Sequence, residues 1–163
     1  MAKITLKNLS HSYLSKQNSK EDWALRDVNI DWKDGGAYAL LGPSGCGKTT
    51  LLNIISGLLK PTKGEVLFDD KDITALNPVE RDIAQIFQFP VIYDTMTVYD
   101  NLAFPLKNRG LSETEIDKKV REIGEMLELT STLQNKASGL TADGKQKISL
   151  GRGLVRSDVN VIM

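Results

Sequence analysis

The segment Gly42-Pro-Ser-Gly-Cys-Gly-Lys-Thr49 decides the fold, because it matches the pattern G-x-x-x-x-G-K-[ST] without a mismatch. Backbone N–H groups of such a loop surround phosphate groups, and the positive end of the following helix faces the same charge. Lys48 would reach the β- and γ-phosphates, and the Thr49 hydroxyl would ligate Mg²⁺. Glycine at 42, 45 and 47 lets the backbone turn sharply and approach the ligand. The segment therefore predicts a nucleotide phosphate site.

The flanking residues favour the order strand, glycine loop, helix. Tyr38–Leu41 is a short apolar run, which is typical of a strand buried on both faces. After the loop, apolar residues recur at helical spacing from Leu51 to Leu58 and predict a buried helix. Lys60-Pro61 should end that helix, because proline cannot continue it.

Composition narrows the class of protein. The chain has 163 residues, enough for one domain, with 21 basic and 21 acidic side chains, so no basic excess argues for a nucleic-acid partner. The single cysteine, Cys46, excludes an internal disulfide and fits a reducing compartment. Polar and apolar residues alternate from Met1, unlike a signal peptide, and no apolar run approaches the roughly 18 residues of a membrane span. A membrane role would therefore need a partner.

Other segments predict an antiparallel subdomain beside the loop. Ile4 and Leu6 alternate with polar residues, as do Val28, Ile30 and Trp32, so two paired strands are expected. Val66 and Phe68 indicate a further strand, and 82–88 another strand of the core. The only histidine, His11, is expected to be an ordinary surface residue.

From about residue 90 the pattern becomes helical. Thr97–Asp100 resembles a capped helix start, with Pro105 kinking the helix or ending it early. Ser112–Glu115 has the sequence of a capping box, and a third helix is expected over Lys145–Arg156. Asn160–Met163 begins another strand-like run. The expected fold class is α/β, with a P-loop core, an antiparallel β subdomain and a helical insert.

These motifs together resemble the nucleotide-binding subunit of ATP-binding-cassette (ABC) transporters, most of all the importer ATPases for sugars, glycerol and glycerol 3-phosphate. Asp82–Gln88 is similar to the family's glutamine-loop strand, and Met96–Phe104 to its next helix. The resemblance covers nearly the whole chain, with the motifs in the correct order. The positions that resemble the family's phosphate loop are Gly42, Pro43, Ser44, Gly45, Cys46, Gly47, Lys48, Thr49 and Thr50.

The resemblance implies ATP and Mg²⁺ as ligands and assigns roles to two further residues. Gln88 would reach Mg²⁺ and the attacking water and would signal to the transport partner; an amide oxygen and nitrogen suit that task. Thr49 would share the metal ion, and Lys48 would be the second catalytic residue, through the phosphate charge. Tyr13 would stack on adenine, with Trp23 as a rival across the polar stretch 15–22. The implied subdomains are 1–89 for the P-loop core and antiparallel sheet, 90–156 for the helical part, and 157–163 for the next core strand.

One segment departs from the family pattern. Where the family has Leu-Ser-Gly-Gly-Gln before a helix, this chain has Leu140-Thr-Ala-Asp-Gly144. In the family this signature covers the γ-phosphate held by the other subunit of a dimer, so Asp143 would bring a carboxylate close to phosphate. We therefore expect a second ATPase subunit with an intact signature. A homodimer with a tolerated variant is the alternative.

The second departure is that the aspartate, glutamate and histidine that the family carries after the strand at 160–163 do not occur here. The sequence is therefore expected to be an amino-terminal fragment, lacking the carboxy-terminal part of the core, that binds ATP but does not hydrolyse it efficiently. The parent would be an ATPase on the cytoplasmic face of the inner or plasma membrane, bound to permease subunits and driving solute import. A non-hydrolysing nucleotide-binding module is the alternative function.

Overall fold

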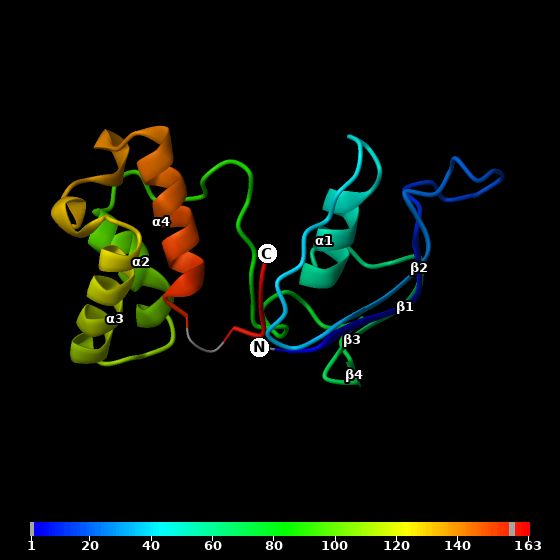
Figure 1. Ribbon diagram of the computed structural model, residues 1–163, viewed down its shortest axis with the longest axis horizontal. Coiled ribbons are helices and arrows are strands. Elements are labelled where there is room, and N and C mark those ends of the chain that lie inside the picture. Colours follow the sequence, from blue (N-terminus) through cyan, green and yellow to red (C-terminus); the bar gives the residue numbers. More distant parts are fainter. Residues whose placement is uncertain (1, 157–158) are drawn as a thin grey trace. The chain divides into compact units, whose positions relative to one another are not determined.

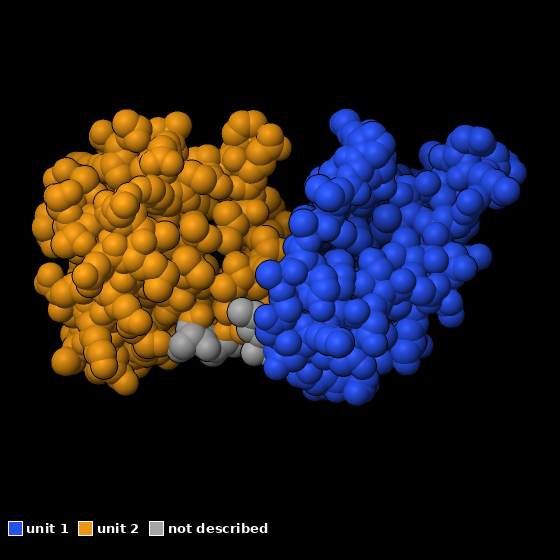
Figure 2. Space-filling model, viewed as in Figure 1, with its two compact units in different colours: residues 1–83 blue, residues 84–163 orange. Residues whose placement is uncertain are grey.

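A computed structural model describes residues 2–156 and 159–163 of the chain. The chain divides into two compact units, Met1–Ile83 and Ala84–Met163, coloured separately in Figure 2. Each unit has its own buried core and is described by itself. Among the described residues, no helix is both long and apolar enough to cross a membrane.

The first unit is built on a four-stranded antiparallel sheet (Figure 1). Its strands are β1 (Ile4–His11), β2 (Leu25–Trp32), β3 (Lys63–Phe68) and β4 (Lys71–Asp72), in the order β2-β1-β3-β4. The predicted pairing of the first two strands is confirmed, with Ile4 opposite Trp32. At the start of β1 and along β2, the apolar side chains are more buried than their polar neighbours, as the alternating sequence predicts.

Helix α1 (Lys48–Ser56) follows the glycine loop, as predicted, and its residues Leu51, Ile54 and Ile55 are buried. It ends earlier than the sequence suggested. Gly57 caps it in the left-handed conformation, with φ 82° and its N–H donating to the Ile54 carbonyl at 3.2 Å. Glycine adopts this conformation without a Cβ penalty, so it ends the helix before Lys60-Pro61 can.

The prediction of a strand over Tyr38–Leu41 is wrong. Residues 37–43 have no strand conformation, and Leu41 is 92% exposed. An apolar run indicates burial, but a strand also needs a hydrogen-bonding neighbour. Within the described part of the first unit, the sheet consists of β1 to β4 and does not include this segment.

Arg81 is the largest fully buried side chain among the described residues, at 1% exposure. Its guanidinium donates to four backbone carbonyls: Ile54 and Ile55 at the end of α1, at 2.7 and 2.9 Å, and Thr74 and Leu76, both at 3.0 Å. Burial lowers the pKa of Arg81 from its ordinary value, and the charge of Asp72 opposes that shift. A positive group at a helix C-terminus also complements the helix dipole. Arg81 thus fixes the end of α1 to the loop at 74–76.

Replacing Arg81 with lysine should lower the free energy of unfolding by about 2 kcal/mol, because a lysine cannot serve four carbonyls in this planar arrangement. Arg26, which is exposed, supplies the matched control as Arg26→Lys. Urea unfolding of the full-length protein measures both. Equal free energies of unfolding for the two variants would show that the Arg81 contacts make no net contribution to stability.

The second unit is mainly helical. It contains α2 (Val98–Lys107), α3 (Glu113–Met126), α4 (Ala142–Leu154) and the short 3₁₀ helices η1 (Thr130–Thr132) and η2 (Ala137–Gly139). Its core is a cluster of apolar side chains from α2, α3 and α4, which include Leu102, Val120 and Ile148. Strand β5 (Ile83–Ala84) pairs with β6 (Val161–Ile162), and the Met163 N–H donates to the Ala84 carbonyl at 2.9 Å.

Both predicted helix caps are confirmed. The Thr97 hydroxyl accepts from the Asp100 N–H at 3.0 Å, and Ser112 and Glu115 form a complete capping box. Pro105 lies inside α2, which ends two residues later at Lys107. The capping pattern identifies these helices from sequence because the cap contacts are local.

Two further predictions in this unit need correction. Helix α4 begins at Ala142, not Lys145, because Thr141 is its N-cap and accepts from the Gly144 N–H at 3.2 Å. The expected strand over 82–88 is reduced to Ile83–Ala84, since β6 pairs with it over two residues only. Gln88 consequently lies in a bend and is exposed.

Candidate phosphate-binding site

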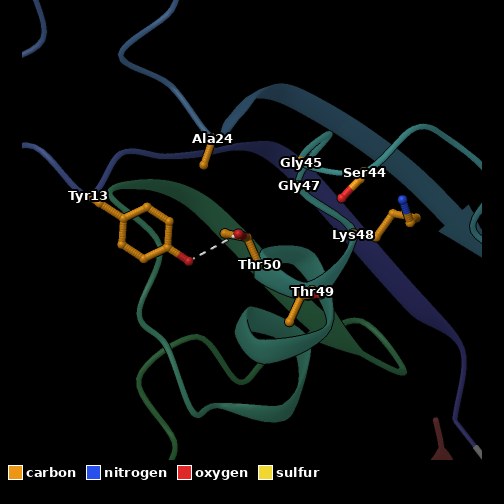
Figure 3. A pocket seen from close by; sticks show the side chains of 8 residues that line it. All are labelled: Tyr13, Ala24, Ser44, Gly45, Gly47, Lys48, Thr49 and Thr50. Atoms are coloured by element: carbon orange, nitrogen blue, oxygen red, sulfur yellow. Dashed lines mark hydrogen bonds between the residues drawn. The ribbon is translucent and has the colours of Figure 1, made fainter. Parts of the chain in front are cut away.

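A pocket of about 320 Å³ surrounds the start of α1 (Figure 3). Three parts of the chain contribute to it: the segment just after β1, the residue before β2, and the glycine loop with the first turn of α1. The lining residues are Tyr13, Ala24, Ser44, Gly45, Gly47, Lys48, Thr49 and Thr50. The structure therefore brings Tyr13 to the same pocket as the predicted phosphate loop.

The start of α1 differs from the starts of the other α-helices in the described part of the chain. Side chains of Thr97, Ser112 and Thr141 cap α2, α3 and α4, and each of those helices has an acidic residue in its first turn. Helix α1 begins after Gly47, which offers no side-chain cap, and has no acidic residue in its first turn. The positive end of α1 and its first N–H groups are thus left for a ligand that brings negative charge.

Gly47 makes the tight entry into α1 possible. Its φ is 92°, in the left-handed region that side chains rarely adopt. A Cβ there would lie 2.5 Å from the Ala24 carbonyl oxygen and 2.8 Å from a methyl carbon of Leu25. The glycine loop therefore passes directly over the start of β2, where only glycine fits.

The Lys48 ammonium is bound to the loop itself. Its Nζ donates to the Gly42 and Pro43 carbonyls, both at 2.8 Å, and lies 3.6 Å from Sγ of Cys46. Two neutral carbonyls satisfy a cation less strongly than charged phosphate oxygens do. The ammonium is thus held at the loop and can exchange these carbonyls for phosphate.

Tyr13 stands at the far side of the pocket from Lys48 in Figure 3, with its side chain largely exposed. Its hydroxyl lies 3.0 Å from the Thr50 hydroxyl, which orients the ring relative to α1. Trp23, the rival, is not among the residues that line the pocket, and Lys63 Nζ lies 5.3 Å from its ring centroid. Of the two aromatic candidates, only Tyr13 lines the pocket, and its role toward adenine stays a prediction.

The expectation that His11 is an ordinary surface residue is wrong. Its side chain is not at the surface but only 6% exposed, with Nδ1 3.4 Å from the Thr62 hydroxyl. Its ring meets the Tyr13 ring edge-on, with centroids 4.7 Å apart. The pairing of β1 with β2 shifts register between Leu6 and Leu9 and again before His11, so simple alternation no longer predicts which face a residue occupies.

Gln88 lies in the second unit, where the Gln146 side chain donates to the neighbouring Phe87 carbonyl at 3.3 Å. Its role toward a metal ion stays a prediction.

Ala24 and Arg81 are residues that sequence reasoning missed. Ala24 is one small apolar residue, and Arg81 stands between two acidic residues, so neither has a sequence pattern that indicates its role. Only the folded chain places Ala24 under the glycine loop and Arg81 at the end of α1.

The pocket offers oxygen and N–H groups rather than a preformed metal cage. In the ranges 2–156 and 159–163, no three His, Cys, Asp or Glu side chains group as metal ligands. The Thr49 hydroxyl is an oxygen donor at the pocket wall, which is the ligand type that Mg²⁺ prefers. Mg²⁺ commonly uses few protein ligands and completes its shell with water and substrate phosphates, so the donor set fits that ion.

Comparison with known proteins gives a consistent result. A family profile described as ABC transporter matches residues 25–163. The trehalose/maltose import ATP-binding protein MalK of Thermococcus litoralis is 45% identical over 139 residues, which is 82% of this chain and 37% of that protein. The sn-glycerol-3-phosphate import ATP-binding protein UgpC of Bordetella avium is 37% identical over 156 residues, or 96% of this chain and 42% of that protein. The chain thus spans about two fifths of the length of these relatives.

Solved structures agree with the sequence relatives. An ATP-binding cassette of an ABC transporter superposes with a TM-score of 0.82 at 31% identity, over 99% of this chain and 68% of that one. A dimeric cassette in a post-hydrolysis state, bound to ADP and Pi, gives 0.79 at 32% identity, over 93% of this chain and 69% of that one. Since profile, relatives and fold all lead to the protein class that the glycine loop and its pocket suggest, the chain belongs to the ABC transporter family, as part of an ATP-binding cassette.

Proposed function

We propose that this chain supplies the ATP-binding pocket of an ABC importer subunit. In the whole subunit, ATP binding and hydrolysis would drive uptake of a small solute such as a sugar, glycerol or glycerol 3-phosphate. The observation that carries the proposal is the uncapped start of α1 beside Lys48, inside a pocket large enough for phosphate groups. The import ATP-binding proteins among its relatives support the transport class.

Each residue of the pocket takes a role that follows from its chemistry. Backbone N–H groups of the loop from Gly42 to Thr50 bind phosphate oxygens, and Lys48 neutralises the charge of the β- and γ-phosphates. Thr49 would ligate Mg²⁺, which when bound would neutralise charge on the phosphates, and Gln88 is proposed as a catalytic residue and a second ligand of that ion. Tyr13 stacks on adenine. The core and sheet would comprise residues 1–89, the helical part 90–156, and the next core strand 157–163.

The proposed assembly contains a second ATPase subunit and transmembrane permease subunits, and it places the chain at the cytoplasmic face of the membrane. A related cassette is described as a dimer, which supports pairing. The partner should be a different ATPase, because Asp143 lies exposed in the first turn of α4, where a phosphate would approach. Lys147 Nζ is 3.9 Å from the Asp143 carboxylate and compensates its charge only in part.

The test uses the full-length subunit, purified alone and with an equal amount of its candidate ATPase partner. Calorimetry should detect ATP and ADP binding by the subunit alone, and ATP hydrolysis should rise when the partner is added. Vigorous cooperative hydrolysis by the subunit alone would contradict the heterodimer. Binding without turnover in either sample would instead establish a non-hydrolysing nucleotide-binding module.

Tyr13→Ala should weaken ATP binding about tenfold, the loss expected for one base-stacking contact. Tyr13→Phe keeps the ring and loses only the hydroxyl contact with Thr50, so it should bind ATP nearly as well as the unaltered subunit. Inorganic triphosphate, which has no base, should bind all three proteins equally. An unchanged ATP affinity for Tyr13→Ala, measured by calorimetry, would remove Tyr13 from the adenine site.

A further inference from the structure

One face of α4 lies against the segment that carries Gln88. We call residues 84–94 the glutamine segment. Gly153, near the end of α4, allows a close approach: a Cβ there would lie 3.3 Å from the Ala84 Cβ and 3.7 Å from a methyl carbon of Ile86. Further toward the helix start, the Gln146 side-chain amide donates to the Phe87 carbonyl at 3.3 Å. The helix and the segment are therefore in contact over most of the length of α4.

Two cations of α4 complete this contact. Lys145 Nζ is 2.9 Å from the Asp94 carboxylate. Arg152, seven residues later and so on the same side of the helix, donates from Nη1 to the Val91 carbonyl at 2.9 Å. The Arg152 guanidinium also lies 4.7 Å from the ring centroid of Tyr93 and 6.0 Å from that of Phe104 in α2. Arg152 thus joins three elements at one point.

The other side of the glutamine segment is held by α2. The buried Asn101 side chain accepts from the Tyr93 N–H at 2.8 Å and donates to the Tyr93 carbonyl at 3.0 Å. Tyr93 is therefore fixed by Asn101 through its backbone and by Arg152 through its ring. The hydrophobic core of the unit takes Ile148 and Val155 from α4 and the residue after it, so Arg152 can be truncated without removing a core side chain.

We propose that Arg152 is a positioning residue that makes α4 and the glutamine segment move as one body. The inference rests on the proposed function. There, the first turn of α4 faces the nucleotide of the second ATPase subunit, and Gln88 responds to Mg²⁺ and the permease. A helix of 13 residues is about 20 Å long and stiff, so contacts at both of its ends transmit a displacement rather than absorb it.

The geometry also explains why the residue is an arginine. The planar guanidinium stacks on Tyr93 and still directs an N–H at the Val91 carbonyl, whereas a lysine ammonium gives a point charge without a stacking face. Arg152→Gln removes both the charge and the stacking. Arg152→Lys keeps the charge and one hydrogen bond, and should therefore recover part of the function.

The experiment uses the full-length subunit assembled with its ATPase partner and permease. Arg152→Gln should reduce the permease-dependent increase in ATP hydrolysis about tenfold, while ATP affinity stays within about twofold, because Arg152 touches the glutamine segment and not the nucleotide pocket. Amide exchange at Tyr93 should become about tenfold faster in the same variant. Arg152→Lys should lie between the unaltered protein and Arg152→Gln. Arg121→Gln is the matched control, since Arg121 pairs with Asp117 on an exposed face of α3.

Three outcomes would overturn the inference. The permease-dependent hydrolysis and the Tyr93 amide exchange rate of Arg152→Gln could equal those of Arg121→Gln. That result would show that Arg152 does not couple α4 to the glutamine segment. ATP affinity, thermal stability and hydrolysis could instead fall in parallel, which would show that Arg152 only stabilises the fold. Both Arg152→Lys and Arg152→Gln could lose the permease-dependent hydrolysis while Tyr93 exchange stays slow, which would show that Arg152 does not act by holding the glutamine segment. If the unaltered assembly shows no permease-dependent hydrolysis, the proposed function fails, and Tyr93 exchange still decides whether α4 holds the segment.

Discussion

Replacing Lys48 with alanine should weaken ATP binding by about a hundredfold, because the charge-assisted contacts of one ammonium with two phosphates contribute about 3 kcal/mol. In the free protein this ammonium is held by the Gly42 and Pro43 carbonyls at 2.8 Å, so a phosphate ligand takes over an oriented group. Calorimetric titration of the full-length subunit with ATP measures the loss. The same titration with inorganic triphosphate should show it equally, because the contact involves no base.

Lys60→Ala is the matched control for this change. Lys60 is exposed beyond the end of α1 and outside the pocket. The same charge is removed in both variants, so a general effect of net charge on an anionic ligand would appear in both. If Lys60→Ala weakened ATP binding as much as Lys48→Ala, the pocket at the start of α1 would not be the binding site.

Replacing Gly47 with alanine should lower the free energy of unfolding by about 3 to 4 kcal/mol. Holding a residue with a side chain at positive φ costs about 1 to 2 kcal/mol, and a clash with backbone in a packed region adds about 2 more. The clash is specific: the new Cβ would lie 2.5 Å from the Ala24 carbonyl oxygen. Relief would require the glycine loop to move away from β2, which would also disturb the phosphate contacts.

Gly45→Ala separates the two contributions. Gly45 has φ 82°, similar to Gly47, but an added Cβ meets nothing within 4 Å. Its free energy of unfolding should therefore fall by about 1 kcal/mol, from backbone strain alone. Urea denaturation of both variants gives the comparison. Equal losses for Gly45→Ala and Gly47→Ala would mean that the close approach to Ala24 is unimportant.

The parts of the fold that sequence predicts well are those set by short-range contacts. The cap of α2 by Thr97 and the capping box of α3 involve residues three apart, so the sequence pattern contains the whole interaction. Alternating residues likewise identify β1 and β2. The glycine loop is the extreme case, since eight consecutive residues specify both its conformation and its charge.

Expectations failed where the deciding contact is distant in sequence. Tyr38–Leu41 is apolar enough for a buried strand, yet none of the strands described in its unit pairs with it. His11 is buried because the register of β1 shifts against β2, which its local pattern does not reveal. Arg81 has the sequence context of a solvated residue, but the fold brings the end of α1, 26 residues away, to its guanidinium.

The candidate site also contains residues that the sequence predicts and residues whose position depends on contacts distant in sequence. The loop from Gly42 to Thr50 follows from sequence alone, whereas the proximity of Tyr13 to Thr50 depends on the fold, since 37 residues separate them. The contact of Arg152 with Val91 spans 61 residues and has no sequence signal at all. The residues proposed to bind phosphate are thus adjacent in sequence, while the position of Tyr13 beside them depends on tertiary structure.

The most direct test of the central claim is to follow backbone amide chemical shifts of the full-length subunit during titration with Mg-ATP. The account predicts that the largest shifts occur from Gly45 to Thr50 and that Tyr13 responds to Mg-ATP but not to magnesium triphosphate. In Lys48→Ala both responses should require about a hundredfold more Mg-ATP. Saturable binding of Mg-ATP with the largest shifts outside the pocket at the start of α1, or no binding at all, would contradict it.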